Sequence, residues 1–216
     1  MSCILKPDYL LVSVIVCDSS DTGSLLQMAQ QSKVVLNCVG PYRFYGEAVV
    51  EACVEAGAHH LDISGEPQYL EKMQLKYHQK AVENGVYVIG ACGFDSIPAD
   101  LGQICVKRGM GGDVNSIETY LKVIIPDLPG AAINFATWQS AIHGFAHAKE
   151  LGGLRKQLYP ERMPKTQPKL KFRGNLHYSD IVDTWCMPFM GSDKSVMTRT
   201  QRSLYHDKNK RCNIIY

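Results

Sequence analysis

Glycines and small polar residues stand directly after each of the apolar runs in the first half of the chain. The set comprises Asp18, Asn37 to Tyr42 (NCVGPY), Asp62 to Glu66 (DISGE) and Ala91 to Ser96 (ACGFDS). Glycine lets a backbone approach a ligand closely, and ligands of open α/β sheets bind beyond the carboxyl ends of the strands. The pattern therefore predicts a ligand site in which the backbone of Val39 and Gly40 faces a ribose or adenine. The alternative is that glycine and proline only form the turns that end each strand, and the pattern leaves both open.

The elements that must position these loops alternate along the first 108 residues. Short apolar runs rich in β-branched residues predict buried strands at 10–17, 33–39, 60–63 and 86–91. Helical spacing and helix-end signals predict helices at 24–31, 46–56 and 67–84, and a loop at 93–100 that enters a fourth helix running to about residue 108. Alternating short strands and helices are typical of a parallel sheet covered on both sides. We therefore expect part of a doubly wound α/β domain over residues 1–108.

Three of these helices carry explicit start, stop or packing signals. Asp21 or Thr22 is expected to cap the first helix, and Gly57 is expected to stop the second. Four apolar residues at spacings of 3, 4 and 4 predict one buried face on the third helix, namely Leu70, Met73, Tyr77 and Ala81.

The pattern changes after residue 108. Residues 117–125 alternate with period two, which predicts an antiparallel strand with one wet side. Residues 131–151 predict one long helix with four large apolar side chains on one face, namely Phe135, Trp138, Ile142 and Phe145. Beyond Gly153 the chain is rich in proline and only weakly periodic. Residues 109–216 are therefore expected to form part of a second, α+β domain.

Charge is divided unevenly along a chain whose formal net charge is only +2. Residues 151–216 hold 13 basic and 5 acidic residues, a balance of +8, and residues 1–150 hold 10 and 16, a balance of −6. The basic part predicts either an anionic lipid surface as partner or an ordinary solvated face. A nucleic-acid partner is not expected, because the basic residues are scattered and not interleaved with aromatics.

Composition excludes several other classes of protein and site. No apolar run reaches 18 residues, so no membrane-spanning helix is expected in this chain. The eight cysteines form no CxxC pair and have no histidine at ligand spacing, which predicts a reducing intracellular compartment and no metal site. Neither a Ser/His/Asp group nor a Tyr-xxx-Lys pair is present, so catalytic residues stay unassigned.

Long stretches of the chain resemble the saccharopine dehydrogenase-like oxidoreductases. The resemblance is carried by VVLNCVGPYRFYGEAVVEACVEAGAHHLDISGEPQYL, GVYVIGACGFDSIPADLG, Trp138 to Phe145 and MPFMGSD (187–193), within about Val12 to Tyr205. It implies a Rossmann-type domain for NAD or NADP and hydride transfer on an unknown substrate. It also implies association with lipid droplets or membrane surfaces and a link to lipid or glycolipid metabolism.

The resemblance also implies which residues meet the cofactor. Asp18 matches a strand end that reaches the adenine, and two loops match those beside the adenine ribose and the nicotinamide, namely Cys38, Val39, Gly40, Pro41 and Tyr42, and Gly93, Phe94 and Asp95. The alternative for Asp95 and Ser96 is a helix cap, slightly favoured. Asp62 and Glu66 are either ligand contacts or charges at a helix N-terminus.

The sequence departs from the family pattern in one important respect. The family begins with a strand, a G-x-x-G-x-x-G turn and a helix whose N-terminus binds the pyrophosphate, and nothing like this precedes Asp18. The second Rossmann strand and the family's hydrophobic C-terminal stretch are also missing. We therefore expect a form shortened at both ends that binds a dinucleotide weakly and is inactive by itself. The alternative function is a non-enzymatic scaffold on a lipid droplet or membrane surface.

Overall fold

The computed structural model describes residues 12–112, 114–124, 133–164, 167–168, 170–171 and 173–208. A parallel sheet forms in the order β1 (Val34–Asn37), β2 (His59–Asp62), β3 (Val88–Ile89). Asn37 lies opposite Asp62, and Leu61 lies opposite Ile89, so the strands end at a common edge. A separate antiparallel hairpin joins β4 (His177–Ser179) to β5 (Thr184–Cys186).

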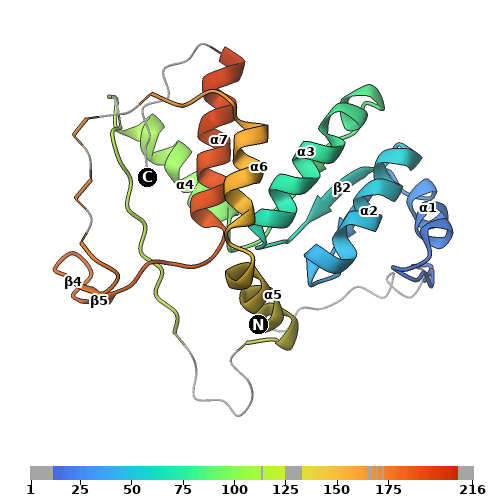
Figure 1. Cartoon of the computed structure of the whole chain (residues 1–216), viewed down its shortest axis with the longest axis horizontal. Helices are drawn as coiled ribbons and strands as arrows, with labels where there is room; N and C mark the ends of the chain where they lie inside the picture. The colour runs from blue at the N-terminus through green and yellow to red at the C-terminus, as the bar shows by residue number, and fades with distance from the viewer. Residues whose placement is uncertain are drawn as a thin grey trace.

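Helices separate the strands and then follow them (Figure 1). The first four are α1 (Thr22–Gln30), α2 (Tyr42–Ala56), α3 (Pro67–Glu83) and α4 (Ile97–Gly109). The later three are α5 (Phe135–Ala146), α6 (Glu150–Leu158) and α7 (Asp193–Lys208). This alternation around a parallel sheet confirms the predicted α/β, Rossmann-type class. The predicted domain boundary after residue 108 falls in the last turn of α4 and stays a prediction.

The predicted helix ends have clear physical causes. Asp21, and not Thr22, caps α1, because its Oδ1 accepts hydrogen bonds from the amides of Gly23 and Ser24. Gly57 ends α2 in the left-handed region, with φ of 76°, which costs glycine little. The second helix begins at Tyr42, four residues before the predicted start.

The core lies on both sides of α2. One cluster packs α2 against α3 through Val50, Val54 and the predicted face of α3, whose four members Leu70, Met73, Tyr77 and Ala81 are all buried. The other cluster packs α2 against α1 through Val49, Cys53 and Leu25. Figure 1 shows α1, α2 and α3 side by side in front of β2.

The sheet is covered differently from the prediction. Asn37, His60 and Asp62 are buried on the face toward these helices, whereas Val34 and Leu36 on the other face are exposed. Cover on both faces is therefore wrong for the described residues. The strands alternate in burial like the strands of a sheet with one open face.

The predicted strand at 10–17 does not form within the described residues. Val12 to Cys17 carries no strand pairing, and Val14 and Val16 are 89% and 93% exposed. Leu10 and Leu11 lie outside the described residues. An apolar run becomes a buried strand only when a neighbouring strand takes up its backbone hydrogen bonds and helices cover it. This segment finds neither partner in the described chain.

The second half also departs from the predicted elements. Residues 117–124 form no strand, and residue 125 lies outside the described residues, as do 131 and 132 of the predicted long helix. That helix divides into α5 and α6. Gln68 Nε2 donates to the Gly144 carbonyl and Arg43 Nη1 to that of His143, so side chains from α2 and α3 bind carbonyls at the end of α5. Within the described ranges, no helix is long and apolar enough to cross a bilayer.

Candidate functional site

The loop after β1 is fixed by two hydrogen bonds and is also exposed to solvent. The buried Asn37 side chain accepts a hydrogen bond from the Val39 amide at 3.0 Å, and Tyr42 Oη donates to the Asn37 carbonyl at 2.9 Å. Burial raises the pKa of Tyr42 to about 12, which keeps its hydroxyl a donor. Cys38, Val39 and Gly40 are exposed at the carboxyl edge of the sheet. A ligand can therefore reach this loop, although the Val39 amide is already bound to Asn37.

Glu66 binds the start of α2 although it belongs to the next loop. Its Oε1 accepts from the Tyr42 amide at 2.8 Å and from Ser140 Oγ at 2.9 Å, and its Oε2 accepts from the Arg43 amide at 3.2 Å. Pro41, the N-cap residue of α2, provides no side-chain cap. Glu66 thus supplies the cap and the charge that the helix N-terminus favours. Of its two predicted roles, the structure shows the helix-terminal charge.

Asp62 is also a structural contact. It is 2% exposed, and its Oδ1 accepts from the amides of Ser64 and Ala91 at 3.0 and 2.9 Å. The carboxylate therefore joins the loop after β2 to the chain after β3. Beside it, burial lowers the pKa of His60, so the imidazole is neutral in the sheet.

The loop after β3 meets the start of α7. Asp95 Oδ2 accepts from the Ser192 amide at 3.3 Å, and the hydroxyls of Ser96 and Ser192 are 2.8 Å apart. Ser96 is the N-cap residue of α4 but makes no side-chain cap bond, so the favoured cap reading is not seen for Ser96. Asp95 Oδ1 is buried and has no hydrogen-bond partner within the described chain. Burial raises the pKa of Asp95, and it raises that of Asp193 to about 6, with the charge of Asp95 adding to the shift.

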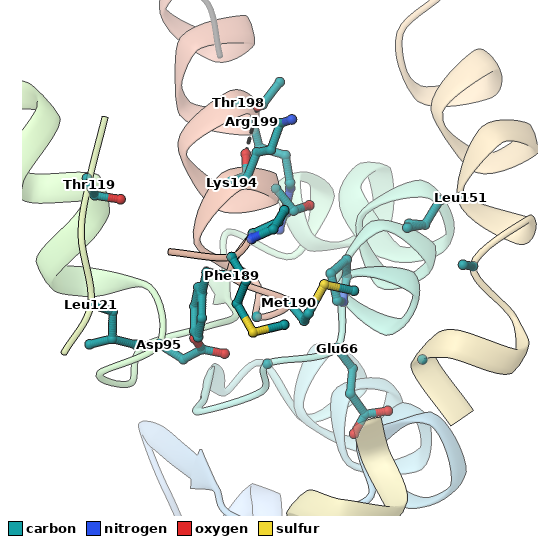
Figure 2. Close-up of a pocket in the computed structure, with 18 of the residues that line it drawn as sticks. Glu66, Asp95, Thr119, Leu121, Leu151, Phe189, Met190, Lys194, Thr198 and Arg199 are labelled. Carbon is teal, nitrogen blue, oxygen red and sulfur yellow. Dashed lines mark hydrogen bonds between the residues drawn. The ribbon is translucent and has the colours of Figure 1, made fainter. Parts of the chain in front are cut away.

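These loops open into one groove of about 2560 Å³. Of the predicted cofactor residues, its walls include Cys38, Gly40, Tyr42 and Asp95. Figure 2 shows Asp95 next to Phe189, with Glu66 farther along the groove. A Cβ at Gly65 would lie 2.9 Å from Asp95 Oδ2, so this glycine makes room for the carboxylate.

The other predicted residues lie elsewhere. Asp18 is exposed in a separate hollow beside Asp21 and Ser24, and hydrogen bonds from Ser20 lower its pKa. Pro41 is buried, and Val39, Gly93 and Phe94 do not line the groove, although Phe94 is exposed. The cofactor role of all nine residues stays a prediction.

Sequence reasoning missed the wall opposite the sheet. That wall is formed by α7 and by the preceding segment 185–191, neither of which was predicted as an element. The string MPFMGSD (187–193) was a signal, but only as part of a resemblance. Among the described residues, no group of three or more His, Cys, Asp or Glu side chains is placed to hold a metal ion.

Comparisons with known proteins show which proteins this chain is similar to. Residues 8–89 match the family model of the saccharopine dehydrogenase NADP binding domain. A human saccharopine dehydrogenase-like oxidoreductase is 51% identical over 91% of this chain and 46% of its own length, and the mouse protein of that name is 49% identical with the same coverage. A Caenorhabditis elegans lipid droplet localized protein is 46% identical over 92% of this chain and 47% of its own length. The chain thus spans about half the length of these relatives. No solved structure matches it significantly.

The name of the matched family model points to NADP as the cofactor, and the geometry of two loops is compatible with such a group. Cys38 to Gly40 are exposed, and a Cβ at Gly40 would meet nothing closer than the Tyr42 ring at 3.7 Å, so a ribose has room there. The buried, unpartnered Oδ1 of Asp95 suits a polar group such as the nicotinamide carboxamide. When bound, the cofactor supplies a hydride. Across nine-tenths of its length, the chain is therefore similar to the saccharopine dehydrogenase-like oxidoreductases, and residues 8–89 match the family's NADP binding domain.

Proposed function

We propose that the protein is an NADPH-linked oxidoreductase that transfers a hydride to a substrate held in the groove. The observation that carries this proposal is the position of the loops after β1 and β3 on the walls of one groove, through Cys38, Gly40 and Asp95. One loop offers exposed backbone to a ribose, and the other offers a buried carboxyl group. The protein's part is to hold and orient the cofactor, which carries the chemistry.

A pair of charge-matched variants tests this site. Gly40→Asp places a carboxylate where the dinucleotide, itself anionic, would lie, and we expect NADPH affinity to fall at least about tenfold, or 1.4 kcal/mol. Gly112→Asp adds the same charge at a glycine whose nearest neighbour is a backbone oxygen at 3.9 Å, and we expect no change. NMR titration with NADPH measures both affinities. Equal NADPH affinities for the two variants would show that the cofactor does not bind at this edge of the sheet.

We further propose that these 216 residues by themselves hold NADPH weakly. They contain no G-x-x-G-x-x-G turn, so the amide donors that such a turn directs at the pyrophosphate must come from elsewhere. Two missing hydrogen bonds to a charged group cost about 3–6 kcal/mol, or roughly 10²–10⁴ in Kd. The expected Kd is therefore near the millimolar range, and a micromolar value would contradict the proposal.

A second candidate function is that of a lipid-surface protein without turnover. Two observations support it: the name of the C. elegans relative and the balance of +8 over residues 151–216. Anionic membranes attract such a surface, and salt screens the attraction. Flotation with phosphatidylserine vesicles should then show binding at low salt that is lost at high salt, whereas absence of binding at both would exclude this function.

A further inference from the structure

The groove has one wall that is uniformly cationic. Every charged residue that α6 and α7 place on it is basic, namely Arg155, Lys194, Arg199 and Arg202. Lys194, Thr198 and Arg202 recur every four residues and therefore share one face of α7. Figure 2 shows Lys194, Thr198 and Arg199 on the turns of α7 above the groove.

Two of these cations already bind hydrogen-bond acceptors within the protein, whereas the charged groups of the other two meet no carboxylate among the described residues. Arg155 binds the buried Glu71 through Nε and Nη2, and Arg199 donates twice to the side-chain oxygen of Gln74. Lys194 is exposed and forms no ion pair within the described residues.

Arg202 points most directly to a missing partner. Its guanidinium lies 4.5 Å from the centre of the Tyr159 ring, while its Nη1 is buried and has no acceptor in the described part of the chain. A buried donor without an acceptor is costly, so this position favours an incoming anion. Thr198 lies one helical turn from both Lys194 and Arg202, on the same face of α7. An anionic group of a ligand therefore fits above Thr198.

The segment that leads into α7 forms an apolar wall of the same groove. Its four large side chains are unusually exposed: Trp185 by 65%, Met187 by 71%, Phe189 by 50% and Met190 by 62%. Figure 2 shows Phe189 and Met190 directed into the space below α7, with Leu121 nearby. Removing such apolar surface from water stabilises a complex. A ligand with a long apolar chain would cover it.

We propose that the groove binds one single-chain anionic amphiphile, with its carboxylate or phosphate head over Thr198 and its acyl chain along residues 185–190. The two walls meet where this segment becomes α7, so head and chain belong to one molecule. The acyl chain then passes Asp95, which binds Ser192 at this junction and lies in the loop predicted to face the nicotinamide. The amphiphile as substrate rests on the proposed function, whereas its binding does not.

The two tryptophans of the chain make the binding directly measurable. Trp138 lies exposed on α5, so the conservative variant Trp138→Phe leaves Trp185 as the sole tryptophan, which is excited selectively at the red edge of the absorption band. Bromine atoms quench tryptophan only at contact. We expect dibromostearate, added below its micelle concentration, to quench Trp185 saturably. The uncharged dibromostearyl alcohol should bind at least about tenfold more weakly. Acetate, which has the head alone and is measured by competition with dibromostearate, should also bind at least about tenfold more weakly.

Charge reversal on α7 tests the position of the head. In the Trp138→Phe background, Lys194→Glu should raise the apparent Kd for dibromostearate at least about tenfold. Lys33→Glu reverses an exposed lysine outside the groove and should leave the Kd unchanged, with circular dichroism confirming that both variants fold.

Four outcomes would overturn the inference. Three concern the monomeric ligands: no saturable quenching, equal affinity for the alcohol and the carboxylate, or equal effects of the two charge reversals on Kd. The fourth is binding to phosphatidylserine vesicles without quenching by monomeric dibromostearate. The last would indicate a membrane surface instead of a groove. None of these measurements contains NADPH. Quenching without NADPH binding would therefore refute the proposed function alone, and NADPH binding without quenching would refute only the amphiphile.

Discussion

Neutralising Glu66 tests how the site is held together. This side chain is 7% exposed and accepts hydrogen bonds from the first amides of α2, at Tyr42 and Arg43, and from Ser140 of α5. The variant Glu66→Gln keeps the size of the side chain but removes its charge. It also turns an amide donor toward groups that are themselves donors. Because Pro41 offers no side-chain cap, no neighbouring group replaces the lost acceptor.

The expected loss of stability follows from the number of contacts. A hydrogen bond to a charged group contributes about 1.5–3 kcal/mol and a neutral one about 0.5–1.5 kcal/mol. Losing one bond and neutralising two should therefore cost about 3 kcal/mol, a large part of a total stability of about 5–15 kcal/mol. With a typical urea dependence of about 1–3 kcal/mol per molar, the unfolding midpoint should fall by at least about 1 M.

A surface glutamate provides the matched control. Glu47 bridges the exposed Lys72 and Lys76 at 2.6 Å, and exposed pairs contribute at most about 1 kcal/mol. Glu47→Gln should therefore shift the urea midpoint much less than Glu66→Gln. Hydrogen exchange should also speed up at the Tyr42 and Arg43 amides in Glu66→Gln alone. Equal midpoints for the two variants, with unchanged exchange, would refute the assigned capping role.

Two further predictions concern packing and pH. A Cβ at Gly46 would lie 2.6–2.9 Å from the buried Tyr69 side chain, so Gly46→Ala should destabilise the fold by about 1–3 kcal/mol. Gly102 has open space around it, so Gly102→Ala should stabilise the fold by up to about 1 kcal/mol. The reverse order of stabilities in urea unfolding would contradict the packing. Burial, and to a lesser extent the charge of Asp95, raises the pKa of Asp193 to about 6 from its ordinary value of 3.8. The folded state therefore favours the protonated carboxyl group, whose contribution to stability is fully present below pH 3.8 and is lost as the pH rises through 6. Asp193→Asn should therefore gain stability over the parent above about pH 6 and lose that gain toward about pH 4, and a gain independent of pH would contradict this.

Local signals in the sequence were sufficient to predict those features whose hydrogen bonds and packing partners lie nearby in the chain. Asp21 caps the helix it precedes, Gly57 ends the one it follows, and the spacing from Leu70 to Ala81 places a buried face on α3. In each case the hydrogen bonds or packing partners that decide the outcome lie within a few turns of chain. Apart from the strand predicted at 10–17, element type and order in the first half were therefore predictable.

Long-range contacts decided the features that the sequence did not predict. Glu66 binds the Tyr42 amide across 24 residues of chain, and Gln68 binds the Gly144 carbonyl across 76. Neither contact produces a periodic pattern of residues in the sequence. Val14 has the composition of a buried strand, yet burial depends on a neighbour that composition cannot specify. The stripe from Phe135 to Phe145 was placed on one helix face correctly, but that face is exposed in the described structure.

The candidate site was only partly readable for the same reason. The rule that ligands bind at the carboxyl ends of parallel strands located Cys38, Gly40 and Asp95, which the structure places on one groove. The opposite wall comes from α7, about 100 residues later in the chain, where Ser192 meets Asp95. Only the folded structure brings these two parts of the sequence together.

The central claim is that a nicotinamide dinucleotide lies against the loops after β1 and β3. NMR titration of the labelled 216-residue chain with NADPH tests it most directly, because chemical shifts detect binding even in the millimolar range. We predict saturable shifts at the amides of Cys38 to Gly40 and Gly93 to Asp95, and smaller shifts elsewhere. Saturable shifts confined to other residues, or none at these amides up to several millimolar NADPH, would contradict the account.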